Sequence, residues 1–411
     1  MNEIDFAKKI QNLGGTAYLV GGAVRDKIRG VIPHDKDYCV TGLDENIFAK
    51  NFPKAAKFGK NFPVYSIFIE KKMCEVALAR TEKKSGSGYK GFAVNFDKNV
   101  TIEQDLFRRD TTINAMAIKI LTGELIDPFG GKSDVLNKKI RAVSKHFVDD
   151  PVRALRAARQ SAQFNFEITP ETLLAMNQCA KEISDEPKER IFNELENALK
   201  TDKPSIFFRS LENSNLLEII FPEIAQLRGK IQPTFFHPEG DAYEHSLNIL
   251  DEVSKINKNP VVRFAALVHD IGKGTTPTEM LPHHYHHEQR GVEVFKEMCQ
   301  NLPLPNDWKK FSAFVIKEHM RAPMFSKAGK ITDFLMRLHN SKINISDFND
   351  IIRADHHGLP DYLENAKIFI AELLKVNGKN APPELQGKEI GEWIFQERIR
   401  RLVKLQKNFA P

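Results

Sequence analysis

Hydrophobic positions along the chain follow two different spacings. Up to about residue 143, short runs of β-branched and aromatic residues alternate with turn signals, as in TAYLVGG (16–22), KDYCVTG (36–42), PVYSIFIEKK (63–72) and EVALAR (75–80). Such runs predict the strands of a small mixed sheet with accompanying helices. From about Asp150 onward the apolar residues take helical spacing, interrupted by short Pro/Gly breaks. The pattern predicts an α+β protein in which a mixed-sheet head is followed by an all-α remainder.

The length of 411 residues predicts several structural units, because a single hydrophobic core stops growing near ~250–300 residues. We expect a head (1–143), a helical neck and body (144–227), a further helical domain (228–345) and a helical tail (346–411). The segment EKKSGSGYKG at 82–91 predicts a mobile loop between two strands of the head. A loop of that length within a compact unit is usually functional.

The amino-acid composition indicates the class of protein and its cellular compartment, but it says little about function. The chain is 41% hydrophobic and 28% charged, which is ordinary for a soluble protein, and it contains no apolar run near the ~18 residues of a membrane span. The first residues lack the apolar core of a signal peptide, and the four cysteines lie far apart without a CxxC pair. We therefore expect a cytoplasmic protein without disulfides or a membrane partner. The formal charge of +6 permits a polyanionic partner without requiring one.

Two neighbouring motifs in the head predict phosphate and metal chemistry. Gly21 and Gly22 end an apolar run and open a helix that carries Arg25, and glycines let backbone N–H groups approach a phosphate. Asp35 and Asp37 follow at the start of the next strand, where residues two apart share a face and can hold a pair of Mg²⁺ ions. Separately, a Gly-Gly turn or an acidic turn is usually structural. Their succession favours the catalytic interpretation.

Histidines concentrate in the second half of the chain. The doublet His269-Asp270 closes the apolar run FAALVHDIGKG, while His245 precedes it and Asp355 follows it. Imidazole and carboxylate ligands together suit Ni²⁺, Co²⁺ or Zn²⁺. We expect a metal site here, with His287 and His319 as further ligands or phosphate contacts, although the run PHHYHHE at 282–288 is equally compatible with a solvated loop. The histidines concerned are His237, His245, His269, His283, His284, His286, His287, His319, His356 and His357.

Several motifs in one order resemble a known family. They are GGAVRD (21–26), DKDYCV (35–40), ALARTEKKSGSGYKGF (77–92), RRDTTINAMA (108–117), DPFGG (127–131), DDPVRALRAARQSAQF (149–164) and KERIFNELENAL (188–199). The order continues through HDIGKGTTP (269–277) to GKEIGEWIFQERIRRL (387–402). In order and spacing the sequence resembles the bacterial class II tRNA nucleotidyltransferases, in the long form that ends in an HD phosphohydrolase domain. The resemblance covers almost the whole chain.

The resemblance implies roles for residues of the head, which would have the polymerase-β-like nucleotidyltransferase fold. Asp35 and Asp37 would hold the metal ions, and Gly22 and Arg25 would hold the triphosphate. A third carboxylate is usual on a later strand in this superfamily. Glu75 matches that position, with Asp110 as the alternative, and Arg109 would reach the incoming nucleotide, while Asn114 and Ala115 would pack the head. On its periodicity alone, RRDTTINAMA could also be an amphipathic helix.

Base selection without a nucleic-acid template is assigned to the segment after Asp149. Asp150 and Arg153 are three residues apart on one predicted helical face, where an acceptor and a fork of donors can imitate a Watson–Crick edge. Arg156 and Arg159 continue the row, and the family match assigns them to the phosphates. Glu189 and Arg190 match the helix that supports the base-selecting pair, although a plain structural ion pair would have the same pattern.

The implied reaction is the sequential transfer of CMP, CMP and AMP from CTP and ATP to the 3′ end of tRNA, with release of pyrophosphate. The HD site would hydrolyse phosphomonoesters, including 2′-nucleotides, and 2′,3′-cyclic phosphates with a transition metal, Ni²⁺ being favoured. The protein would be a monomer or a homodimer. Alternatives are a poly(A) polymerase, an enzyme that adds CC or A alone, a synthetase and hydrolase of signalling nucleotides, and a non-catalytic RNA-binding protein. The intact metal-binding pairs weigh against the last alternative.

Overall fold

The computed structural model describes residues 1–411 apart from 59–63, 85, 87–90, 234, 236–238 and 410–411. The chain forms two compact units. The first comprises Met1–Ala198 with Ile206–Ile220, and the second comprises Leu199–Ser205 with Phe221–Pro411. Among the described residues, no helix combines the length and the apolar character that a membrane span requires.

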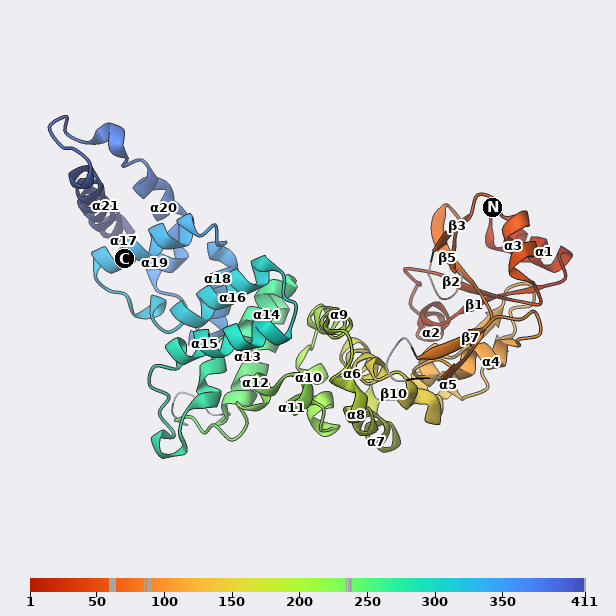
Figure 1. The fold of residues 1–411 in the computed structure, drawn as a ribbon. Helices are drawn as coiled ribbons and strands as arrows, with labels where there is room; N and C mark the ends of the chain where they lie inside the picture. Colours follow the sequence, from red (N-terminus) through yellow and green to blue (C-terminus); the bar gives the residue numbers. More distant parts are fainter. Residues whose placement is uncertain (59–63, 85, 87–90, 234, 236–238, 410–411) are drawn as a thin grey trace. The chain divides into compact units, whose positions relative to one another are not determined.

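A seven-stranded mixed sheet forms the centre of the head (Figure 1). Its order is β3-β4-β5-β2-β1-β8-β9, and the pair β2 and β5 is parallel. Alternate residues of β4, such as Tyr65 and Ile67, are buried, as a strand with one covered face requires. The strands are β1 (Thr16–Val20), β2 (Asp37–Thr41), β3 (Ala56–Phe58), β4 (Val64–Ile69), β5 (Lys72–Leu78), β8 (Ala117–Lys119) and β9 (Leu125–Ile126).

Short helices and one separate hairpin complete the head. The hairpin joins β6 (Thr81–Lys84) to β7 (Phe92–Asn95). Part of the predicted loop 82–91 is therefore strand, because three of its residues pair with β7, and residues 85 and 87–90 lie outside the described part of the chain. The helices are α1 (Glu3–Asn12), α2 (Gly22–Ile28), α3 (Glu45–Asn51), α4 (Ile102–Phe107), η1 (Thr112–Asn114), α5 (Gly131–Leu136) and η2 (Lys145–Asp149).

The rest of the first unit is helical except for one small sheet. After α6 the backbone of Asn165 turns left-handed with φ 54°, and the chain then pairs β11 (Glu167–Ile168) with β10 (Lys139–Ile140). The expectation of an all-α remainder therefore missed a two-residue strand, which is too short to leave an alternating pattern. The helices are α6 (Val152–Phe164), α7 (Pro170–Gln178), α8 (Ala180–Ile183), α9 (Lys188–Leu199), α10 (Ser205–Asn213) and α11 (Leu217–Ile220).

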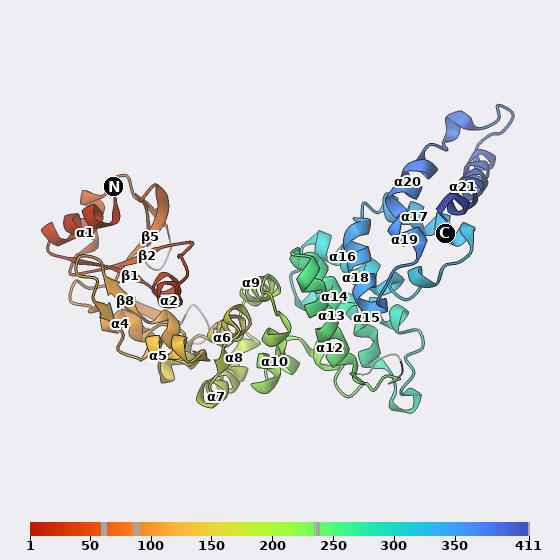
Figure 2. The ribbon, with the colours of Figure 1, turned by 180° about the vertical axis from the view of Figure 1, so that it is seen from behind.

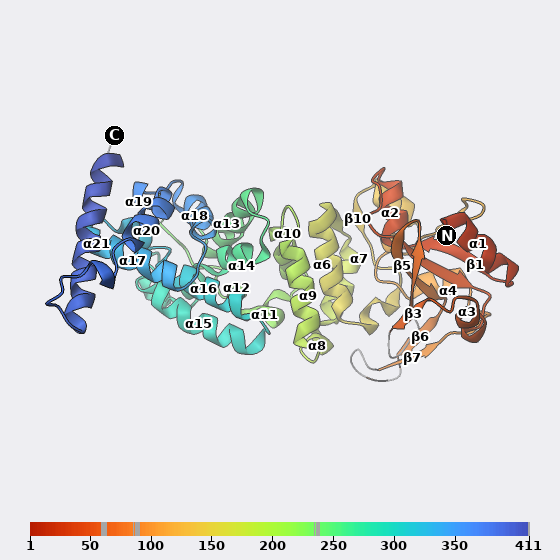
Figure 3. The same ribbon diagram turned by 90° about the horizontal axis from the view of Figure 1, so that it is seen from above.

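The second unit is a helical bundle in which α13, α14, α16 and α18 pack together (Figure 2). Its core includes Val253, Phe334 and Phe348. The long α21 lies against α17 and α20 (Figure 3). The prediction of a mixed-sheet head followed by helices is confirmed. The helices are α12 (Pro222–Ala225), α13 (Ala242–Ile256), α14 (Pro260–Val268), η3 (Ile271–Thr275), η4 (Thr278–Met280), α15 (His287–Asn301), α16 (Asn306–Glu318), η5 (Ala322–Met324), α17 (Ala328–Asn340), α18 (Ile345–His356), α19 (Asp361–Glu364), α20 (Ala366–Leu374), η6 (Gly378–Asn380) and α21 (Lys388–Phe409).

Two candidate active sites

A strongly cationic cavity lies within the first unit. Its volume is about 830 Å³, which is ample for a nucleotide. Among the described residues, eight arginines and four carboxylates line it. An excess of guanidinium groups in a concave site attracts multiply charged anions such as a triphosphate. The charged lining residues are Arg25, Asp37, Arg80, Glu82, Arg108, Arg109, Asp110, Asp150, Arg153, Arg156, Arg159 and Arg190.

The Gly-Gly turn makes room for two of these arginines. Gly21 has φ +68°, and a side chain there would come within 2.9 Å of Nη1 of Arg109. At Gly22 a side chain would come within 3.2 Å of Nη2 of Arg25. Both guanidinium groups therefore pack against the backbone where β1 meets α2. The missing side chains of the two glycines therefore allow these guanidinium groups to approach the backbone closely.

Asp37 and Glu75 lie side by side on the parallel strands β2 and β5. Desolvation and the charge of Glu75 raise the pKa of Asp37, while Arg109 opposes the shift. Asp35 lies in a bend before β2, its side chain is 84% exposed, and it is 3.0 Å from Nδ1 of His34. The expectation that Asp35 and Asp37 share a strand face is wrong, because β2 begins at Asp37. Asp35 remains near enough for its charge to raise the pKa of Asp37.

The alternative third carboxylate, Asp110, is committed to other partners. It is buried, and Oδ2 accepts hydrogen bonds from Nε of Arg156 at 2.8 Å and from Nε2 of Gln160 at 3.0 Å. Oδ1 accepts from the backbone N–H of Thr111 at 2.7 Å and from Asn114 at 3.3 Å. Burial raises the pKa of Asp110, but the charge of Arg156 outweighs it and holds the pKa below its usual range. Asp110 therefore organises arginine and amide side chains.

RRDTTINAMA does not form the alternative amphipathic helix. It runs through the short η1 into β8, with Ala115 fully buried. Arg109 ends on the cavity, where Nη2 is 3.2 Å from Oδ2 of Asp105. Asn114 does more than pack the head, since its Oδ1 accepts a 2.6 Å hydrogen bond from Nη1 of Arg25.

Asp150 and Arg153 line the cavity together, but they do not share a helical face. Asp150 is extended, with φ −118°, and precedes α6; its Oδ1 accepts from the N–H of Val152 at 3.2 Å. The expected helix begins later because Pro151 supplies its first turn. Nη1 of Arg153 donates to the carbonyl of His146 at 2.6 Å, which orients the guanidinium. Nη2 of Arg190 donates to Oδ2 of Asp150 at 2.9 Å, as the supporting role predicts.

Carboxylates that the sequence analysis missed hold the remaining arginines. Nε of Arg159 donates to Oε2 of Glu194 at 2.5 Å, and Nη1 of Arg156 is 3.5 Å from Oε1 of the same residue. Glu82 pairs with Arg80 and Arg108 and lies 4.0 Å from Arg153. Glu189, which was expected beside Arg190, is exposed. Glu82 and Glu194 lie on elements other than those of most of their arginine partners. The sequence around each glutamate therefore does not predict these pairings.

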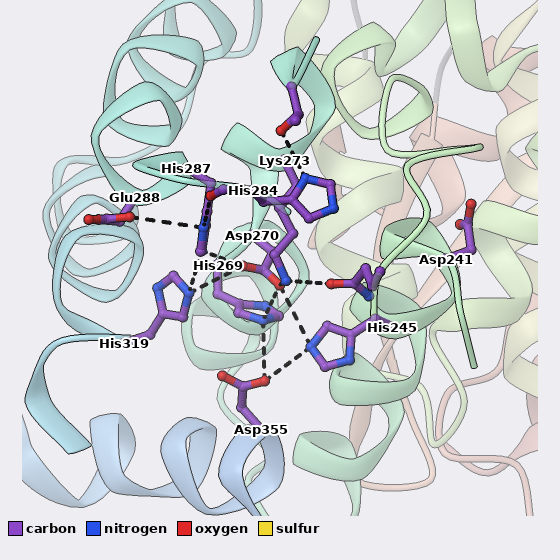
Figure 4. A network of polar contacts seen from close by, with 12 residues as sticks. Asp241, His245, His269, Asp270, Lys273, His284, His287, Glu288, His319 and Asp355 are labelled. Carbon is purple, nitrogen blue, oxygen red and sulfur yellow. Dashed lines mark hydrogen bonds and ion pairs between the residues drawn. The ribbon is translucent and has the colours of Figure 1, made fainter. Parts of the chain in front are cut away.

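Six side chains that are distant in sequence converge inside the second unit (Figure 4). They come from α13, from the ends of α14 and α16, from the start of α15 and from α18. Their imidazole and carboxylate groups are almost fully buried. We call them the histidine cluster: His245, His269, Asp270, His287, His319 and Asp355.

Asp270 divides the cluster into two sets of ligands (Figure 4). Its Oδ2 is 3.3 Å from Nε2 of His269 and 3.7 Å from Nε2 of His245. Its Oδ1 is 3.0 Å from Nε2 of His287 and 3.2 Å from Nε2 of His319. Each oxygen therefore faces its own pair of imidazoles, an arrangement in which one carboxylate can bridge two cations.

The four imidazoles of the cluster are oriented as metal ligands are. Each has Nδ1 beside a carbonyl or carboxylate oxygen, so in the neutral ring Nδ1 carries the proton and Nε2 directs its lone pair into the cluster. Within the described structure, Nε2 of His269 is buried without a hydrogen-bond partner, which fits a donor atom intended for a cation. The acceptors are Glu239 for His245 at 2.6 Å, Ala266 for His269 at 2.7 Å, His284 for His287 at 2.9 Å and Ile316 for His319 at 3.0 Å.

The charges of the cluster complete this fit. Asp355 Oδ1 is 3.0 Å from Nε2 of His245 and 3.7 Å from Nε2 of His269. Burial lowers the pKa of His269, but Asp270 and Asp355 outweigh it and raise the pKa to about 10. Nζ of Lys273, which the sequence analysis did not single out, is 2.5 Å from Oδ2 of Asp270. The two buried carboxylates thus stabilise a protonated imidazole, and one of them also pairs with an ammonium group. A site that attracts positive charge in this way is suited to divalent cations.

The neighbouring histidines have other roles. The ring of His284 is held by Thr276 and by the carbonyl of Ile231, and burial lowers its pKa to about 4. His283 is exposed and stacks on Tyr285. His286 and His357 have left-handed backbones, with φ 58° and 54°, beside the ends of α15 and α18, and His356 lies 3.3 Å from Asp355. His237 lies outside the described residues.

Known domain families match three successive parts of the chain. Residues 17–141 match the family described as "Poly A polymerase head domain". Residues 165–227 match "Probable RNA and SrmB- binding site of polymerase A". Residues 242–366 match "HD domain". The histidine cluster lies within the match at 242–366, whereas the residues that line the cationic cavity lie in the first two matches and in the unmatched residues 142–164 between them.

Similar proteins span nearly the full length. The chain is 38% identical over 409 residues to the multifunctional CCA protein of Acinetobacter baylyi, covering 95% of this chain and 98% of that protein. It is 45% identical over 401 residues to the multifunctional CCA protein of Nitrosococcus oceani, covering 94% and 97%. In fold it resembles the CCA-adding enzyme of Bacillus stearothermophilus in complex with CTP, with a TM-score of 0.67 at 23% identity over 98% and 92% of the two chains.

Proposed function

Because this chain belongs to the family of multifunctional CCA proteins, we propose that it adds and repairs the 3′-terminal CCA of tRNA with CTP and ATP, releasing pyrophosphate. The observation that carries the proposal is the cavity in which a Gly-Gly turn, Asp37 and eight arginines meet, with Glu75 beside Asp37 on the neighbouring strand. Such a site can hold a triphosphate at one end and a base at the other. We assign residues 1–143 to the transfer head, 144–227 to base selection and tRNA binding, 228–345 to the HD domain and 346–411 to a helical tail.

In the head, Arg25 and Arg109 would hold the triphosphate against the glycine turn. Asp37 and Glu75 would hold Mg²⁺, with Asp35 as a further ligand from its exposed bend. Their oxygen donors suit a hard cation. Desolvation and then the charge of Glu75 raise the pKa of Asp37, and a cation would offset both effects. When bound, the ions supply Lewis-acid stabilisation of the transferring phosphoryl group.

Base choice would belong to Asp150 and Arg153. The Asp150 carboxylate accepts hydrogen bonds and the Arg153 fork donates them, so together they can pair with the edges of C and A. Arg190 and the His146 carbonyl hold these groups in place. Arg156 and Arg159, held by Asp110 and Glu194, would contact the phosphates.

The test uses purified protein and three tRNA substrates that end before the first C, after the first C and after the second C. Each is incubated with labelled CTP, ATP, UTP or GTP, and the products are sequenced. We expect C, C and A to be added in order, with UTP and GTP excluded. Addition of A to every substrate indicates a poly(A) polymerase, and a product that stops at CC or requires CC indicates a partial enzyme.

We further propose that the histidine cluster is a metal-dependent phosphohydrolase acting on phosphomonoesters, including 2′-nucleotides, and on 2′,3′-cyclic phosphates. The observation in its favour is the pair of ligand sets that share Asp270. Nitrogen-rich sets favour Ni²⁺ among the available divalent ions, with Co²⁺ or Zn²⁺ next. Bound ions would polarise the phosphoryl oxygens. The cluster residues would hold them, and Lys273 adds a positive charge beside the site.

Hydrolysis of 2′,3′-cyclic AMP, 2′-AMP and p-nitrophenyl phosphate by metal-stripped protein tests this second function. We expect activity after addition of Ni²⁺ or Co²⁺ and loss of it in Asp270→Asn. Asp241→Asn is the matched control, since Asp241 caps α13 and is not a member of the cluster. Full activity in Asp270→Asn, or none with any metal in the wild-type protein, would contradict the proposal.

A further inference from the structure

One aromatic ring in the first unit faces two guanidinium groups. Phe164 is the last residue of α6 and is half-buried. Its ring centroid is 4.2 Å from Cζ of Arg25 and 4.7 Å from Cζ of Arg29, and both arginines belong to α2 or its C-terminal cap. A cation over an aromatic face within about 6 Å is attracted by the ring quadrupole. The ring therefore connects the end of α6 to the helix that follows the glycine turn.

Arg25 needs such a partner because its carboxylate is shared. Nε of Arg25 is 3.1 Å from Oδ1 of Asp26, and Nη1 of Arg29 is 3.3 Å from the same atom. Arg25 is 9% exposed, so little water stabilises its charge. Burial lowers the pKa of Arg25, Asp26 opposes this shift, and the positive charges of Arg29 and Arg159 add to it. An aromatic face offsets this repulsion without adding negative charge to a site that must receive an anion.

The ring is one of several contacts that hold the Arg25 guanidinium group. Nη1 of Arg25 donates to Oδ1 of Asn114 at 2.6 Å, and Nη2 lies against Gly22. Nε and Nη2 donate to Oδ1 and Oδ2 of Asp26 at 3.1 and 3.2 Å, and the Phe164 ring centroid lies 4.2 Å from Cζ. The fork is thus preorganised on the wall of the cavity, which reduces the entropy lost when it binds a phosphate.

We propose that Phe164 is a positioning residue for nucleoside triphosphates, acting through Arg25. The inference rests on the proposed nucleotidyl transfer and names a residue that orients its triphosphate site. Phe164 lies eleven residues after Arg153 on the same helix. Its effect is therefore on the phosphates, equally for CTP and ATP, and leaves the choice between the bases unchanged.

The substitution Phe164→Leu keeps an apolar side chain and removes the aromatic face. We expect the affinity for CTP and for ATP, measured by calorimetry, to fall about five-fold each, which corresponds to about 1 kcal/mol. The affinity for CMP should stay within two-fold, since CMP lacks the outer phosphates. In tRNA assays KM should rise for both nucleotides while kcat and the ratio of C to A addition stay near wild type. Phe164→Tyr should restore wild-type values because it restores the ring face.

The matched control is Phe166→Leu. Phe166 is 6% exposed and its ring centroid is 5.7 Å from that of Phe164, so the control loses an aromatic core side chain from the same region. We expect it to lower the melting temperature and to leave the CTP to CMP affinity ratio unchanged.

Three outcomes would overturn the inference: an unchanged CTP affinity in Phe164→Leu, an equal loss of CMP affinity, or a failure of Phe164→Tyr to restore binding. Because these readouts are equilibrium affinities, they do not depend on transfer. A protein that binds CTP in this way and adds nothing to tRNA would contradict the proposed function while supporting the role of Phe164. A wild-type protein that does not bind CTP would overturn both.

Discussion

Replacing His319 by Gln should remove one metal ion from the histidine cluster and leave another bound. Nε2 of His319 faces Oδ1 of Asp270 at 3.2 Å and Nε2 of His287 at 3.3 Å. The group of His245, His269 and Asp270 keeps all its members in this variant, whereas the two groups that contain His319 each lose one ligand. Glutamine preserves much of the side-chain volume, so the buried site is not left with a large cavity.

The expected magnitude follows from the contacts that remain. The group of Asp270, His287 and His319 would retain only Asp270 and His287 from the chain. Loss of an outer-shell partner typically weakens a metal site by 10–100-fold, and loss of a direct ligand should cost at least the upper value, or about 2.7 kcal/mol. An ion present at 100 times its Kd stabilises a protein by about 2.7 kcal/mol, so the variant should forfeit nearly all of that contribution. For a unit of this size the melting temperature should rise about 5–10 °C less upon Ni²⁺ addition.

The assay is calorimetric titration of metal-stripped protein with Ni²⁺, supported by elemental analysis after dialysis. We expect two ions per chain in the wild type, one in His319→Gln and none in Asp270→Asn, which removes charge from both sets. His339→Gln is the control, because His339 lies in the last turn of α17 and outside the cluster. A stoichiometry of one in the wild type, or of two in His319→Gln, would refute the assignment of a bridging Asp270.

Three further predictions address the separate sites. Asp37→Asn should reduce C and A addition alike, by about 10³-fold if several kcal/mol of metal stabilisation are lost, and single-turnover rates with each nucleotide check this; an effect on A alone would contradict a shared centre. Arg153→Lys keeps the charge and loses the donor fork, so discrimination against UTP and GTP should fall by about 10-fold or more with a smaller change in triphosphate affinity, as competition assays measure. Because His269 has a pKa of about 10 in the absence of metal, metal binding must displace its proton, and the apparent Ni²⁺ affinity should rise with pH below that value; a pH-independent affinity would be inconsistent with His269 as a ligand.

Short runs of β-branched and aromatic residues between turn signals predicted the strands of the head, because such residues are buried in its sheet. The strands at 16–20, 37–41 and 64–69 begin and end within a few residues of the predicted apolar runs. Glu75 was placed by resemblance, and the parallel register of β2 and β5 sets it beside Asp37. Such neighbours follow from the order of strands in the sheet, which a single sequence does not contain.

The sequence analysis failed where a pairing depends on tertiary structure. Asp35 was expected to share a strand with Asp37, but Asp35 lies in a bend because the strand begins at Asp37, two residues later than the argument required. Glu82 and Glu194 approach the arginines from other elements, β6 and α9. The sequence separation between each glutamate and its distant arginine partner does not match a helical or strand repeat. Most glutamates lie on the protein surface, and only the tertiary structure determines which of them pairs with an arginine of the cavity.

The two sites should operate independently because their donor atoms select different ions. Asp37 and Glu75 offer carboxylate oxygens at a cavity rich in arginine, where Mg²⁺ would accompany a triphosphate in the proposed reaction. The histidine cluster offers four imidazole nitrogens and two buried carboxylates, a set that binds Mg²⁺ poorly and Ni²⁺, Co²⁺ or Zn²⁺ well. Chelation followed by addition of Mg²⁺ alone should therefore restore nucleotide addition and leave hydrolysis absent, while addition of Ni²⁺ should restore hydrolysis. Recovery of both activities with Mg²⁺ alone would mean that the donor sets do not separate the two functions.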